Sequence, residues 1–139
     1  MINHYIVMAS AYSIGKRIAL DYHSNSELPF EQITKDINYI NEFDGVFACA
    51  SLLHLDNEDL LVVLKKISLS LKDKGILYTS FKLGDGNRTD NGKFYNDMTG
   101  EKFLSLCNNI KELKILKMWI TSQYKSDAKF INYIIQKNK

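Results

Sequence analysis

Four residues carry side chains that can bind or deprotonate a small molecule: His54, Lys82, Arg88 and Tyr95. His54 follows an apolar run, and an imidazole titrates near neutral pH, so it can serve as a general base. The alternative for His54 is a packed residue at the entrance of a helix. Lys82, Arg88 and Tyr95 offer two positive charges and an aromatic ring, which suit an anionic or polar small molecule.

Residues 84–88 are rich in glycine, aspartate and asparagine, the composition of a turn. A phosphate-binding loop requires a helix N-terminus directly behind it, and the next helix signal comes only at Thr99. Residues 84–91 are therefore predicted as a loop rather than a phosphate cradle. Two interpretations stay open for it, a flexible lid over the substrate and a solvated turn.

The elements that must position these residues begin at Phe43. Residues 43–50 form a short apolar run without alternation, which is typical of a strand buried on both faces. Asp56 supplies an N-cap, and leucines at helical spacing predict a helix over residues 57–72, with Gly75 placed for a left-handed C-cap. A second strand is predicted over residues 76–81.

The remaining pattern predicts a helix and a closing hairpin. Thr99 is a plausible cap for a helix that carries Phe103 and Cys107. Residues 113–121 and 129–136 are rich in β-formers, and only seven residues separate them, too few for a helical crossover. The whole order predicts an α/β fold, a mostly parallel Rossmann-like sheet with right-handed crossovers and an antiparallel hairpin at its end.

The first 42 residues are harder to assign. Residues 5–12 fit a short helix or a strand, and residues 16–22 are predicted as a strand. A strand–helix–strand unit takes about 30 residues, so at most one fits before Phe43. The chain is therefore predicted to be a single domain, 1–139, with a short amino-terminal region over 1–42 and a well-defined part over 43–139.

Composition and charge exclude several classes of protein. The 139 residues carry 18 Lys and Arg against 16 Asp and Glu, a net charge of +2, with neither a basic face for nucleic acid nor an acidic tail. Apolar stretches are shorter than the ~20 residues of a membrane span. Cys49 and Cys107 lie in apolar runs without a CxxC motif or a Cys/His cluster. These features predict a cytoplasmic protein with two buried thiols and no metal, nucleic-acid or membrane partner.

Several passages resemble one family. Residues 42–55 (EFDGVFACASLLHL) resemble the fourth strand and following turn of class I S-adenosylmethionine-dependent methyltransferases. Residues 71–77 (LKDKGIL) are similar to the LKPGGxL passage into the family's fifth strand. Residues 81–94 resemble the next loop of the tellurite-resistance-type branch. The resemblance implies S-adenosylmethionine as cofactor, methyl transfer to a small molecule, and cofactor contact by the backbone of Ala48, Cys49 and Ala50.

The family's glycine-rich turn, where the backbone approaches the cofactor and no side chain fits, has no counterpart before Phe43. Residues 15–26 resemble that turn with every loop glycine replaced. In a competing alignment, residues 9–12 end the family's second helix, and Phe30 and Glu31 lie in the stretch that contacts adenine. Neither alignment restores the turn. Because at most one strand–helix–strand unit fits before Phe43, the family's amino-terminal strands are expected to be missing or reduced.

Two functions follow. The first is an S-adenosylmethionine-dependent methyltransferase that acts on a small molecule. The second is a non-catalytic remnant or self-associating binding module without a cofactor. Loss of the first strands would leave residues 43–50 with an unpaired edge, which is an aggregation hazard. Either residues 16–22 fill that place, or two chains pair edge to edge, so a homodimer is predicted.

Overall fold

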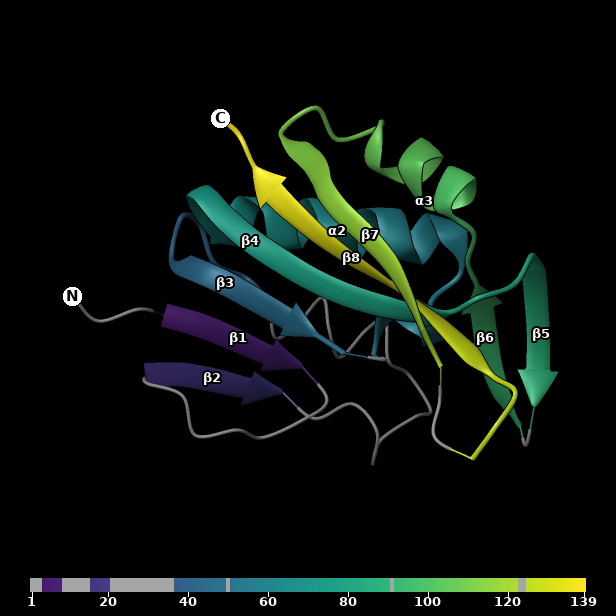
Figure 1. Cartoon of the computed structure of the whole chain (residues 1–139). Helices are drawn as coiled ribbons and strands as arrows, with labels where there is room; N and C mark the ends of the chain where they lie inside the picture. Colours follow the sequence, from purple (N-terminus) through teal and green to yellow (C-terminus); the bar gives the residue numbers. More distant parts are fainter. Residues whose placement is uncertain (1–3, 9–15, 21–36, 50, 91, 123–124) are drawn as a thin grey trace.

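A six-stranded mixed sheet forms the centre of the molecule, and a two-stranded hairpin projects from one end of it (Figure 1). The computed structural model describes residues 4–8, 16–20, 37–49, 51–90, 92–122 and 125–139. The large sheet contains β1 (His4–Met8), β2 (Lys16–Leu20), β3 (Phe43–Ala48), β4 (Leu71–Lys82), β7 (Leu113–Ser122) and β8 (Lys129–Lys137). The hairpin contains β5 (Gly86–Asp90) and β6 (Lys93–Asp97), and the helices are η1 (Leu52–His54), α2 (Asn57–Ser70) and α3 (Gly100–Cys107).

The strand order is β2-β1-β3-β4-β8-β7. Strands β2, β1, β3 and β4 pair in parallel, whereas β8 is antiparallel to both β4 and β7. Val46 lies opposite Leu77 in the parallel pair β3–β4, the arrangement that the predicted helical crossover requires. The α/β fold and the closing antiparallel hairpin are thus confirmed, and the sheet as a whole is mixed.

The strand beside β3 is β1, and β2 pairs on the far side of β1. The prediction that residues 16–22 fill the place next to residues 43–50 is therefore wrong. Ile6 lies opposite Val46 on one side of β3, and β4 pairs on its other side. Strand β3 has no unpaired edge, so the dimer predicted through that edge loses its physical motive.

Helix α2 begins as predicted and ends earlier. The side chain of Asp56 accepts a hydrogen bond from the backbone N–H of Asp59 at 2.8 Å, which caps the helix. The last helical residue is Ser70, and β4 starts at the next position. Lys74, with φ 69°, adopts the left-handed conformation that was expected of Gly75. Gly75 is needed for space instead, because a Cβ there would lie 2.8 Å from the carbonyl oxygen of Lys72.

Helices α2 and α3 lie over the same face of the sheet, and the hydrophobic core lies between them and the strands (Figure 1). Three rings form its centre, with Phe103 stacked on Tyr133 at 4.1 Å and Phe81 tilted against Phe103 at 5.5 Å. Thr99 caps α3 as predicted, accepting a hydrogen bond from Lys102 N. Cys107 is buried in this core.

The two thiols differ. Both cysteines are free, but Cys49 is half-buried, so only one of them is a buried core residue as predicted. Within the described part of the chain, no helix has the length and apolar character needed to cross a membrane. The same residues hold no group of three or more His, Cys, Asp and Glu side chains that could bind a metal ion.

Candidate functional site

The carboxyl ends of β3 and β4 lie side by side, with Ala48 opposite Thr79. Open α/β sheets bind their ligands at this end of the strands. The side chain of Ala48 is fully buried, so only its backbone can meet a ligand, whereas Cys49 is half-buried with Sγ 3.9 Å from Ser80 Oγ. Of the five predicted cofactor contacts, only Ala48 and Cys49 fall within the described residues. The other three lie outside them: Phe30, Glu31 and Ala50.

The four predicted substrate-binding residues meet around one ring. The guanidinium carbon of Arg88 lies 4.3 Å from the ring centroid of Tyr95, and the Lys82 ammonium lies 4.9 Å from it. The imidazole of His54 packs against the same ring, with 4.8 Å between the centroids. Lys82 comes from the end of β4, His54 from η1, and the other two from the hairpin. The structure therefore brings all four together at the carboxyl end of the sheet.

His54 is held in place by the hairpin. Its Nδ1 lies 2.9 Å from the carbonyl oxygen of Phe94. A carbonyl oxygen only accepts, so this hydrogen bond requires the proton of the ring on Nδ1. His54 is thus a packed residue at the entrance of a helix and, at the same time, a member of the cluster around Tyr95.

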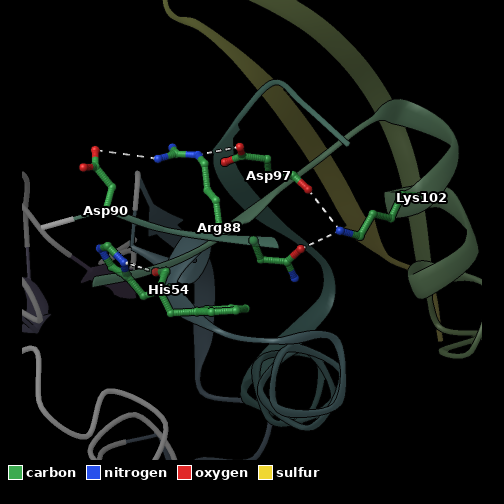
Figure 2. A network of polar contacts seen from close by, with 7 residues as sticks. His54, Arg88, Asp90, Asp97 and Lys102 are labelled. Atoms are coloured by element: carbon green, nitrogen blue, oxygen red, sulfur yellow. Dashed lines mark hydrogen bonds and ion pairs between the residues drawn. The ribbon is translucent and has the colours of Figure 1, made fainter. Parts of the chain in front are cut away.

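Arg88 is oriented by a carboxylate that the sequence alone did not single out. Its Nε donates to Asp97 Oδ2 at 2.6 Å, and its Nη1 lies 3.9 Å from Asp90 Oδ2 (Figure 2). The hydrogen bond to Asp97 raises the pKa of Arg88 above its usual value, so the guanidinium stays charged at every accessible pH. Gly84 leaves room for this carboxylate, because a Cβ on Gly84 would lie 3.0 Å from Asp97 Cβ.

Asn96 and Lys102 fasten the hairpin to the rest of the molecule. Asn96 is fully buried, and its side-chain amide donates to Leu55 O at 3.0 Å and to Asn57 Oδ1 at 2.9 Å. Lys102 on α3 donates to Asn96 Oδ1 at 2.6 Å and to the carbonyl oxygen of Asp97 at 3.0 Å (Figure 2). These bonds connect the hairpin to the start of α2 and to α3.

Residues 84–91 were predicted as a loop, and this prediction is wrong for most of them. Residues 86–90 are strand β5, which pairs with β6. The dipeptide Asn91-Gly92 between the two strands is a strong short-range signal for a hairpin and was overlooked. Gly92 has φ 75°, which that turn requires. The next helix begins only at Gly100, directly after the cap that the sequence predicts at Thr99.

Among the described residues, three buried polar atoms near this end of the sheet have no hydrogen-bond partner: Ser51 Oγ, Thr79 Oγ1 and Asp97 Oδ1. Ser51 directly precedes η1 and follows β3 closely, so its hydroxyl lies near the place where a ligand would bind at the carboxyl end of β3. A buried hydroxyl without a partner is unfavourable by about 1–3 kcal/mol, which a bound ligand or water can relieve. The end of β3 therefore fits a polar ligand.

A groove among the described residues lies elsewhere. Its volume is about 690 Å³, and its lining includes Asn41 before β3, Leu69 in the last turn of α2 and Lys137 at the end of β8. This is the opposite end of the sheet from His54 and Tyr95. Lys137 donates there to the carbonyl oxygen of Leu71, the residue that caps the C-terminal end of α2, at 2.7 Å. The candidate site is therefore assigned from the direction of the parallel strands, whose carboxyl ends lie beside it, and not from the size of this groove.

The fold described above is that of the S-adenosylmethionine-dependent methyltransferases. A 1,6-didemethyltoxoflavin-N1-methyltransferase of Burkholderia thailandensis superposes with a TM-score of 0.80 over 99% of this chain and 72% of that one, at 14% identity. An S-adenosylmethionine-dependent methyltransferase of Clostridium acetobutylicum gives 0.68 over 100% and 85%, at 15% identity. The [4+2]-cyclase SpnF gives 0.66 over 98% and 74%, at 12% identity.

No protein-family model and no curated protein sequence matches the chain. At identities of 12–15%, the likeness establishes the fold and leaves the reaction to be argued from the site.

Proposed function

We propose that the chain binds S-adenosylmethionine at the carboxyl ends of its parallel strands and transfers the methyl group to a small anionic molecule. The fold supports the cofactor, and the half-buried Cys49 with the unpartnered Ser51 hydroxyl supports a ligand at the end of β3. When bound, the cofactor supplies an electrophilic methyl group. In this proposal the backbone of Ala48 and Cys49 lies beside the cofactor, and Ser51 donates or accepts one hydrogen bond.

The cluster around Tyr95 carries the substrate half of the proposal. Lys82 and Arg88 bind the anionic group of the substrate, since both are cations held at the same ring. Tyr95 and His54 form the adjoining wall and exclude water from it. Methyl transfer demands positioning more than covalent chemistry, so two oriented cations and a rigid aromatic wall are sufficient equipment.

One observation carries this proposal above the others: four residues spread over 42 positions of the sequence, from His54 to Tyr95, converge at the sheet end where α/β folds bind ligands. We also assign the chain to the tellurite-resistance-type branch, for which residues 81–94 are the support. A cytoplasmic location is part of the proposal, and the two free thiols support it.

Isothermal titration calorimetry with S-adenosylmethionine and S-adenosylhomocysteine tests the proposal. A dissociation constant in the micromolar range is expected for each. The variant Cys49→Phe should lose the binding heat because a phenyl ring fills the space at the end of β3. The matched control Val62→Phe enlarges an exposed side chain on α2 and should bind normally. The proposal would be contradicted if the unmodified chain gave no binding heat at about 1 mM cofactor, or if Cys49→Phe bound the cofactor as well as the unmodified chain does.

A second candidate is a binding module without a cofactor. Gly15 is the only glycine before Gly45, so the residues after β1 and β2 lack the glycine-rich turn on which close backbone approach depends. The likeness to a cyclase also illustrates that this fold accommodates reactions other than methyl transfer. Small anions that bind at Lys82 and Arg88 in the absence of any cofactor binding would favour this candidate.

A further inference from the structure

Strand β7 forms one edge of the large sheet and β2 forms the other. An edge strand presents unpaired backbone N–H and C=O groups, and natural proteins protect such edges by short length or by charge. Strand β2 has both protections, since it has five residues and begins with Lys16 and Arg17. Strand β7 has ten residues, and within the described chain nothing pairs with its outer side.

Exposed apolar side chains gather on β7 and on the neighbouring helix α3. We call them the β7 patch, which consists of Leu104 of α3 and Leu116, Met118 and Ile120 of β7. These four side chains are 50%, 49%, 51% and 54% exposed. They make up four of the nine large hydrophobic side chains exposed in the described part of the chain. Leu104 and Met118 line the same hollow, and Met118 and Ile120 share one face of the strand, so these side chains are clustered rather than scattered, which marks an interaction surface.

A hollow adjoins the patch. It has a volume of about 480 Å³ and is lined mainly by α3 and β7, with Gly100, Leu104, Ile115 and Met118 among its walls. Gly100 keeps it open at one side, because the sulfur of Met118 lies 2.8 Å from the position of a Cβ there. The surface therefore offers both protruding side chains and a recess, which is what a self-complementary contact requires.

The amino half of β7 is protected and the carboxyl half is not. A bulge interrupts the pairing with β8 between Ile115 and Lys117, and lysines occupy positions 114 and 117. Bulges and lysines both discourage pairing at an edge. Residues 118–122 carry no charge and continue regularly to the end of the strand. Any additional strand therefore has to pair with the carboxyl half.

We propose that this half pairs with the same segment of a second copy of the chain, in an antiparallel two-fold arrangement that extends the sheet across both molecules. Side chains directly opposite each other must point to the same face. Met118 and Ile120 lie opposite Tyr133 and Ile131 on the helix-covered face, and Trp119 lies opposite Asn132 on the other face. Only registers whose paired residue numbers add to an even sum satisfy this condition.

The register centred on Trp119 uses the segment between the bulge and the end of the strand. It places Met118 opposite Ile120 of the second copy twice, and Trp119 opposite Trp119 of the second copy. Lys117 then faces Thr121 of the second copy, so no like charges meet. A strand from an unrelated protein has no such reason to match, whereas a second copy brings apolar residues against the β7 patch by symmetry.

Sedimentation velocity and light scattering on the full chain over a concentration series test the proposal. We expect a species of twice the chain mass of 16.0 kDa. The double variant M118K/I120K places lysines opposite each other and should raise the dissociation constant at least about tenfold. The double variant M118K/I120E pairs opposite charges in the proposed register and should restore the dimer. The control V62K alters an exposed side chain on α2 and should dimerise normally.

A cysteine scan tests the register itself. Residues paired across the two-fold axis have Cα atoms about 4.5–5.5 Å apart, within reach of a disulfide. Trp119→Cys should therefore form a reducible dimer under mild oxidation, and Thr121→Cys should not. A monomer of 16.0 kDa at every concentration up to about 1 mM would overturn the proposal. Equal dimerisation of M118K/I120K, or cross-linking at 121 in place of 119, would also overturn it.

Discussion

Two neighbouring regions at the carboxyl end of β4 are held together by different forces. Under α3, Phe81, Phe103 and Tyr133 are fully buried and contact one another as rings. The hairpin β5–β6, which directly precedes α3 in the chain, is held by charged and polar side chains. Arg88 is hydrogen-bonded to Asp97, and Lys102 is hydrogen-bonded to Asn96. Most of the side chains of the candidate site are half-exposed here.

The difference separates stability from function. Burial of the three aromatic rings raises the free energy of unfolding in proportion to the apolar area removed from water. The core is therefore the dominant source of stability. The polar bonds of the hairpin contribute less each, but they determine where Arg88 and Tyr95 lie. Changes at the buried rings should therefore destabilise the protein most, whereas changes at Arg88 and Tyr95 should mainly alter the candidate site.

The largest effect is expected from Phe103→Ala. Removal of the ring leaves a cavity between Phe81 and Tyr133, and the free energy of unfolding should fall by about 4 kcal/mol. Urea unfolding followed by circular dichroism measures the loss. The adjacent Leu104, which is half-exposed, provides the control, since Leu104→Ala should cost less than about 1 kcal/mol. Equal losses would mean that the rings do not dominate the core.

A smaller loss is expected from Asn96→Ala in the hairpin. The change removes the bonds to Leu55 O and to Lys102 and leaves buried polar groups without partners, so unfolding should become easier by about 3 kcal/mol. Asn87 lies directly opposite on β5 and is exposed, which makes Asn87→Ala the matched control. The same urea series compares the two, and a cost at Asn96 no larger than at Asn87 would contradict the anchoring role.

Alkaline pH should weaken the core. Burial raises the pKa of Cys107 to about 12 and also raises the pKa of Tyr133. Because the folded pKa exceeds the unfolded value, the protonated groups stabilise the fold fully below about pH 9, and this contribution disappears as the pH rises toward about 12.

Between about pH 8 and about pH 10.5, Cys107 alone should lower the free energy of unfolding by about 2 kcal/mol. Denaturant unfolding at each pH measures this slope. In Cys107→Ala the slope should be reduced by that amount. An unchanged slope in Cys107→Ala would disprove the assignment.

The smallest effect on stability, and the sharpest on function, is expected from Lys82→Met. Lys82 is half-exposed and contacts the ring of Tyr95, so unfolding should change by less than about 0.5 kcal/mol. Binding of a small anion, with benzoate and inorganic phosphate as probes, should weaken about tenfold. Nuclear magnetic resonance shifts of Tyr95 report the binding. Lys65→Met, at an exposed position on α2, should bind the probes normally, and an equal loss in both variants would contradict a specific anion site.

Several elements were predictable because their signals are local. The cap at Asp56, the helical spacing of leucines in α2 and the short apolar run of β3 all act within a few residues. Gly75 shows the limit of such reasoning, because a glycine after a helix favours a left-handed cap, yet the crowding by Leu71 and Lys72 explains it better. The hairpin β5–β6 had a local signal, Asn91-Gly92, which a glycine-rich composition concealed.

The residue types of His54, Lys82, Arg88 and Tyr95 already predicted an anionic or polar small molecule as ligand, because charge and aromaticity belong to the side chains themselves. The roles of Asn96, Asp97 and Lys102 had no such signal, since each depends on groups in other elements.

The sequence by itself determined β3, α2, β4, α3, β7 and β8 and their order, but not β5 and β6, because periodicity and capping are properties of short segments. Only the tertiary structure decided that β1 lies beside β3, that four distant side chains meet at one ring, and that β7 is left as the long edge. These outcomes depend on strand pairing between segments far apart in the chain, and no local pattern encodes the partner.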